Sequence, residues 1–201
     1  MGPTELIAMA ASFSLLAGWR LYAAVLVAGI AMHFDIIPLP EHLASLKLLG
    51  SPWVLGVAFL GTVAEFLADK IAWVDSAWDS VHTIIRPLGG ALLALAIIDP
   101  GQPVWQIVVL LLGGGSALLT HGAKAGTRAA VNASPEPVSN VVMSTAEDVT
   151  TTSILLIALA NPWIALALAL LLLAATIGIF FAVRRFVKDV TDLFRPRDPS
   201  A

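Results

Sequence analysis

The sequence predicts an all-α integral membrane protein, a polytopic bundle of about six membrane segments. Hydrophobic residues make up 58% of the 201 residues and charged residues only 12%, whereas a soluble domain carries about 25% charged residues. The mean hydropathy of +0.89 points the same way. Because a helix needs about 20 apolar residues to cross a bilayer, residues 1–201 have room for one transmembrane domain of five or six crossings.

Apolar stretches separated by proline-rich or polar breaks define the expected segments. Asp99-Pro100 and Asn161-Pro162 end two stretches that are too short to span a bilayer alone. Two of the six segments are therefore expected to be short or broken. In chain order, the expected segments cover residues 6–32, 53–64, 87–98, 104–119, 154–160 and 163–183.

The positions of lysine and arginine predict the orientation. The tail over 186–201, with Arg184 and Arg185 just before it, is basic, and such residues near membrane segments stay in the cytoplasm. Six crossings with both termini in the cytoplasm leave Lys47 as the only basic residue outside. Five crossings fit the other basic residues less well. We expect a multi-pass protein of a bacterial inner membrane.

A weak internal similarity suggests an inverted repeat, with halves at 1–103 and 104–185. Ala17-Gly18-Trp19-Arg20 resembles Ala125-Gly126-Thr127-Arg128, and each half contains one of the two short stretches. Interrupted segments in matching places of two halves are typical of transporters with a site at the membrane midplane. The alternative is a chance match between Ala- and Gly-rich helices.

Arg20 lies near the centre of a long apolar stretch, where a charge is costly. It should face the bundle interior beside a partner, and Glu65, which also interrupts an apolar stretch, is the expected one. The pair would serve a substrate or proton pathway, or would only lock two helices together.

Residues 65–86 hold the densest group of ionisable side chains. On a helix, Asp75, Asp79, His82 and Arg86 share one face. Such a face could relay protons or bind a cation. The alternative is an interfacial amphipathic helix with its charges in water. The full group comprises Glu65, Asp69, Lys70, Asp75, Asp79, His82 and Arg86.

Residues 122–153 form a second polar region, with Arg128, Glu147 and Asp148 as candidate pathway residues. Pro135 and Pro137 exclude one continuous helix. The region is expected to be a re-entrant loop that lines a cavity, or else a cytoplasmic loop. Isolated histidines are expected at the membrane interface, and Gly122-x-x-x-Gly126 fits a helix-packing motif. The histidines concerned are His33, His42 and His121.

Three motifs resemble a family of small multi-pass bacterial membrane proteins known as domain of unknown function 4126. The resemblance covers nearly the whole chain and implies a multi-pass membrane protein, without an activity. The motifs are Ala17-Gly18-Trp19-Arg20, Glu65-x-x-x-Asp69-Lys70 and Val74-Asp75-Ser76-x-Trp78-Asp79-x-x-His82-Thr83-x-x-Arg86-Pro87.

These observations favour a small secondary transporter or a lipid-linked-substrate flippase with a polar intramembrane cavity. Its cations suggest an anionic small molecule or lipid-linked substrate, and its acids suggest proton coupling. The alternative is a scaffold or accessory subunit whose buried charges are structural. An intramembrane enzyme ranks third, because the common catalytic motifs are absent from the sequence. No cofactor, metal or nucleic acid is expected, the partner is the lipid bilayer, and a homo-oligomer is an open option.

Overall fold

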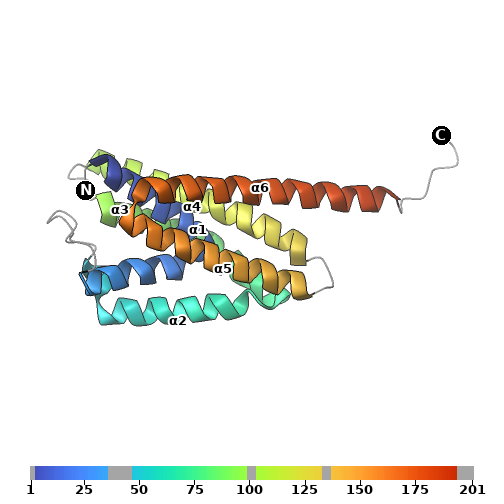
Figure 1. Ribbon diagram of the computed structural model, residues 1–201, viewed down its shortest axis with the longest axis horizontal. Coiled ribbons are helices and arrows are strands. Elements are labelled where there is room, and N and C mark those ends of the chain that lie inside the picture. Colours follow the sequence, from blue (N-terminus) through green and yellow to red (C-terminus); the bar gives the residue numbers. More distant parts are fainter. Residues whose placement is uncertain (1–2, 36–46, 99–102, 133–136, 194–201) are drawn as a thin grey trace.

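A computed structural model describes residues 3–35, 47–98, 103–132 and 137–193. These residues form six α-helices, and the four ranges contain no strand. Five helices are long and apolar enough to cross a membrane, while α2 is shorter. The predicted all-α membrane bundle is confirmed (Figure 1). The helices are α1 (Pro3–His33), α2 (Pro52–Ala68), α3 (Ala72–Ile98), α4 (Pro103–Asn132), α5 (Pro137–Ala160) and α6 (Pro162–Leu193).

Two stretches expected to be short are the second halves of long helices. Residues 87–98 continue the polar segment before them in α3, with Pro87 inside the helix. Residues 154–160 likewise end α5. Charged residues precede each of these stretches in the sequence, which favours a break before it. In the bundle, those charges are buried against opposite charges, so the polar halves continue as helix.

α1 is a helical hairpin, because the chain reverses direction at Arg20. Arg20 has non-helical backbone angles, φ −142° and ψ 77°. The Ser14 hydroxyl donates to the Gly90 carbonyl at 3.1 Å, and Leu21 packs against the neighbouring Gly89. In a straight helix, residues seven apart lie about 10 Å from one another along the axis. The two arms therefore run along the same half of α3 in opposite directions (Figure 1).

Both arms of α1 reach the same end of the bundle. Ile7 of the first arm and Ile98 line one cavity, and Val25 of the returning arm lines another with Ala96. His33, at the end of α1, shares a hydrogen bond with the Gly50 carbonyl at 2.9 Å, just before α2. α1 thus enters and leaves on one side, as a re-entrant segment does.

The helices after α1 run in alternating directions, so α6 ends opposite the start of α1 (Figure 1). This arrangement differs from the six crossings with both termini on one side that the charge pattern suggested. The difference arises because α1 turns back at Arg20. The basic residues still segregate: Lys70, Arg128, Arg184 and Arg185 lie towards the end where α6 finishes, and Lys47 at the other.

The hairpin forms the core of the bundle. α1 contacts each of the other five helices. Of its most apolar window, 67% is buried, against 22% for α6. Large apolar side chains on the outer helices, such as Leu111 and Leu171, are exposed and suit a lipid environment. Arg20, at the tip of the hairpin, is consequently surrounded by protein.

Helices approach one another closely at glycines outside the predicted Gly122-x-x-x-Gly126 motif. A Cβ on Gly18, near the hairpin tip, would overlap the Thr120 side chain and the Ala117 carbonyl of α4. A Cβ on Gly122 would meet nothing within 4 Å, and one on Gly126 would meet only the Phe180 ring. The Gly122-x-x-x-Gly126 motif therefore brings no two backbones together among the described residues.

Candidate functional site

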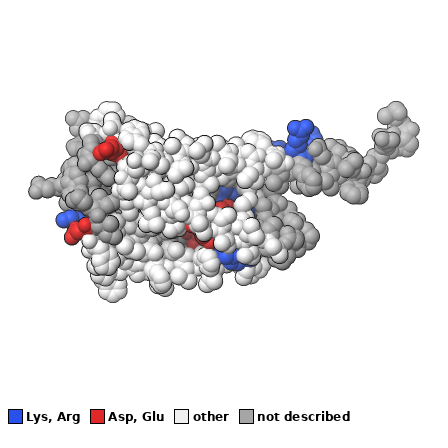
Figure 2. Space-filling model, in the orientation of Figure 1, with Lys and Arg blue, Asp and Glu red and all other residues white. Residues whose placement is uncertain are grey.

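Ionisable side chains from five helices and one turn surround the tip of the α1 hairpin, and we call this group the charge cluster. It contains five cations and six acids. Most are at most 5% exposed, and Lys70, Glu147 and Asp148 are more accessible. Figure 2 shows little charge on the visible face of the helical body. The members are Arg20, Lys70, Arg86, Lys124, Arg128, Glu65, Asp69, Asp75, Asp79, Glu147 and Asp148.

Arg20 does have a buried acidic partner, but not the one that the sequence suggested. It pairs with Asp69 and with Asp148, the latter at 2.9 Å, while Glu147 lies at 3.6 Å. Glu65 instead accepts a 2.6 Å hydrogen bond from Arg86. The expectation of an Arg20–Glu65 pair was wrong because the chain turns at Arg20, which carries its guanidinium past Glu65 to the end of α2 and to α5.

Asp69 connects three cations. It caps the C-terminus of α2, in the turn before α3. One carboxylate oxygen contacts both Arg20 and Lys124, the latter at 3.3 Å, and its backbone carbonyl accepts a 2.5 Å hydrogen bond from Arg128. Burial by itself raises the pKa of this carboxyl, but the charges of Lys124 and Arg20 outweigh it. The pKa is held below its usual range, and Asp69 is ionised.

Arg86 links α2, α3 and α4 and is fully buried. It donates to Glu65 and, at 2.9 Å, to Asp79. Its Nη1 atom also lies 2.6 Å from Nδ1 of His121. Because a guanidinium can only donate, Nδ1 accepts, and the proton of this imidazole is on Nε2, which faces the Asp79 carbonyl at 3.1 Å. Arg86 therefore has three partners.

His121 is thus part of the site. The expectation that it is an isolated residue at the membrane interface was wrong. His121 is 1% exposed. The sequence did contain a signal for this role of His121. His121, Lys124 and Arg128 lie three and four positions apart and therefore share one face of α4. His42 lies outside the described residues.

The face formed by Asp75, Asp79, His82 and Arg86 is buried, so its charges do not lie in water as an interfacial helix would place them. It does not gather metal ligands either: Arg128 donates to Asp75 at 3.0 Å, and Arg86 takes Asp79. No group of three metal-ligating side chains occurs in the four described ranges.

His82 is held by two hydrogen bonds. Nδ1 lies 2.7 Å from the Trp78 carbonyl, which can only accept, so this nitrogen carries the proton. Nε2 shares a hydrogen bond with the Tyr22 hydroxyl at 3.0 Å. The imidazole also stacks on the Trp78 ring, with centroids 4.3 Å apart. The side chain joins the returning arm of α1 to α3.

The described residues of the second polar region, 122–132 and 137–153, are helical and belong to α4 and α5. α4 extends to Asn132 and α5 begins at Pro137, as the two prolines predicted. Within α5, the Ser144 hydroxyl accepts from Lys70 at 2.5 Å, and Lys70 also reaches Asp148 at 3.2 Å. The region therefore delivers side chains to the charge cluster from two membrane helices.

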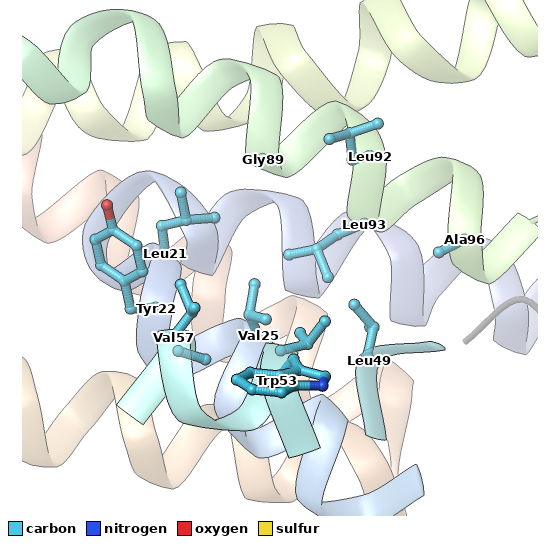
Figure 3. A pocket seen from close by; sticks show the side chains of 12 residues that line it. Leu21, Tyr22, Val25, Leu49, Trp53, Val57, Gly89, Leu92, Leu93 and Ala96 are labelled. Carbon is cyan, nitrogen blue, oxygen red and sulfur yellow. The ribbon is translucent and has the colours of Figure 1, made fainter. Parts of the chain in front are cut away.

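A polar and an apolar cavity lie beside α3, in addition to the one lined by Ile7 and Ile98. A polar groove of about 260 Å³ between α3 and α4 is lined by Asp75, Asp79 and Arg128, with the exposed hydroxyls of Ser76 and Ser80 at its edge. An apolar pocket of about 430 Å³ lies between the returning arm of α1, α2 and α3. Figure 3 shows this pocket with its lining side chains.

Comparison with known proteins gives one match. A family model described as a domain of unknown function, DUF4126, matches residues 7–182. The matched range contains the whole charge cluster. No curated protein and no solved structure matches the chain.

Proposed function

This chain belongs to the DUF4126 family, and we propose that it is a small secondary transporter whose substrate path passes through the charge cluster. The re-entrant α1 carries this proposal. A broken helix whose break lies among buried charges is the arrangement that many transporters use to form a midplane site. Arg20, at this break, is held by side chains of the α2–α3 turn and of α5, together with a 3.3 Å contact to the Ser144 carbonyl.

The composition of the core favours transport over a scaffold. Buried ion pairs are weak contributors to stability, because desolvation offsets their attraction. A helix bundle that only has to hold its shape can pack with small and apolar residues. Here the pairs join different helices: Arg86 links α3 to α2, and Arg128 links α4 to α3. Exchange of partners within the cluster would therefore move helices relative to one another.

The cavities favour an amphiphilic, lipid-linked substrate over a small water-soluble one. The polar groove beside Asp75 and Arg128 offers contacts to a head group. The apolar pocket between α1, α2 and α3 suits a hydrocarbon chain. Each cation of the cluster already has an acidic partner, so an anionic head group has to replace a carboxylate. Asp148, 23% exposed beside Lys70, is the most accessible one to replace.

We infer from the charge rule for membrane proteins that the end of the bundle where α6 finishes lies in the cytoplasm. The hairpin then enters from the outside of a bacterial inner membrane. The charge cluster lies between the hairpin tip and the cytoplasmic ends of α2 and α4, where a substrate released from the hairpin side would reach the cytoplasm.

Accessibility of Ser144 tests the transporter directly. Ser144→Cys, in this cysteine-free chain, places a thiol at a fully buried position beside Lys70. We expect a charged, membrane-impermeant thiol reagent to label it from both sides of sealed vesicles, because a transporter opens its site to each side in turn. Ala158→Cys, equally buried in the apolar part of α5, is the control and should stay unlabelled.

Two outcomes contradict the proposal. Labelling of Ser144→Cys from neither side would indicate a permanently closed cluster and favour the scaffold. Labelling from one side alone would indicate a fixed vestibule without alternating access.

A further inference from the structure

One acid of the charge cluster lacks the partner that the others have. Glu65, Asp69, Asp75, Asp79 and Asp148 each contact a cation at 3.3 Å or less. The nearest cation to Glu147 among the described residues is Arg20, 3.6 Å from Oε2, and that oxygen has no hydrogen-bond partner among them. The Glu147 side chain is nevertheless only 11% exposed.

The charge balance identifies the same residue. With its five cations and six acids all ionised, the cluster carries one excess negative charge in the interior of a membrane protein, where uncompensated charge is costly. One bound proton removes the excess. Protonation of Glu147 disrupts less than protonation of any other acid in the cluster, because Glu147 loses a 3.6 Å contact and no shorter ion pair.

We propose that Glu147 is the proton-binding residue of this transporter, an inference that rests on the proposed function. The charged groups that face it are Arg20 of α1, Asp69 of the α2–α3 turn, and Lys124 and Arg128 of α4. Asp148 is its neighbour in α5. Asp79, which belongs to the α3 face that could relay protons, is less suited because Arg86 donates to it at 2.9 Å.

The site couples a proton to the hairpin through Arg20. Ionised Glu147 attracts the guanidinium, in competition with Asp69 and Asp148. When a proton from water binds a Glu147 oxygen, that attraction ends, and Arg20 is left to the other two acids. Because Arg20 is the residue at which α1 reverses, the two protonation states favour different positions of the hairpin tip.

Infrared difference spectroscopy of the purified full-length protein in lipid, between acidic and alkaline buffer, tests this assignment. We expect a carbonyl band of a protonated carboxylic acid that is lost in Glu147→Gln. Glu147→Asp should keep a band, which shows that the variant site still titrates. Glu5→Gln, at the far end of α1, makes the same chemical change outside the cluster and should leave the band unchanged.

Asp148→Asn gives a second test, in which the direction of a shift in the pH midpoint of the band is predicted. Removing that negative charge favours the ionised form of Glu147, so the midpoint of the band should move to lower pH. A band that persists in Glu147→Gln, or a midpoint that moves to higher pH in Asp148→Asn, would overturn the assignment. A Glu147-dependent band together with an unreactive Ser144→Cys would instead retain the proton site and reject the transporter.

Discussion

Arg86→Met should be among the most damaging single substitutions in this protein. The guanidinium is fully buried and donates to both Glu65 and Asp79. Its removal leaves Glu65, itself 1% exposed, without its cation. Breaking a buried pair in this way costs about 3–5 kcal/mol. We expect a large drop in melting temperature in detergent, followed by intrinsic tryptophan fluorescence, and a lower yield of folded protein.

A double variant separates lost pairing from lost packing. Arg86→Met combined with Glu65→Gln removes the stranded charge, so it should be more stable than Arg86→Met alone. Arg184→Met, an exposed position on α6, is the control and should melt like the wild type. If the two losses simply add in the double variant, Arg86 and Glu65 do not form the pair described above.

The second large effect is expected from a single added methyl group at Gly18. A Cβ there would overlap the Ala117 carbonyl oxygen and would lie 2.9 Å from the His121 backbone nitrogen, both in α4. Backbone atoms cannot rotate away, so Gly18→Ala should push the hairpin tip from α4. Overpacking of this kind typically costs about 1–3 kcal/mol. The measurement is again the melting temperature in detergent.

Gly122→Ala is the matched control, because a Cβ at this helical position would meet nothing within 4 Å. It should be neutral or stabilising, since alanine is favoured over glycine in a helix by about 1 kcal/mol. Gly18→Ala combined with Thr120→Ala should remain destabilised, because the clash with the Ala117 backbone persists. Equal melting temperatures for Gly18→Ala and Gly122→Ala would contradict the close contact between α1 and α4.

The sequence predicted the parts of the site that depend on spacing within one helix. Asp75, Asp79, His82 and Arg86 fall on one face at three- and four-residue intervals, and all four are buried together. That Arg20 needs an acidic partner followed from the cost of a charge in an apolar stretch. These inferences need only the helical period and the energetics of burial.

The inferences that failed depend on the path of the chain. Nothing between residues 6 and 32 resembles a turn, because Arg20 lies within an apolar run without proline. The reversal that turns its side chain to Asp69 accompanies packing of both arms against α3 and of the tip against α4, which are contacts distant in sequence. A six-crossing topology and a re-entrant α1 both leave the basic residues segregated. The positions of lysine and arginine therefore could not distinguish the two topologies. The half-repeat assignment stays a prediction.

We propose that α1 enters and leaves the membrane on one side and presents Arg20 to the charge cluster. Single cysteines in the cysteine-free chain test it: Thr4→Cys at the start of α1, Leu48→Cys after it, and Val138→Cys at the start of α5, all at exposed positions. With an impermeant thiol reagent on intact cells, we expect Thr4→Cys and Leu48→Cys to be labelled from outside, and Val138→Cys only after permeabilisation. Thr4→Cys sharing the side of Val138→Cys would mean that α1 crosses the membrane, and would contradict the hairpin.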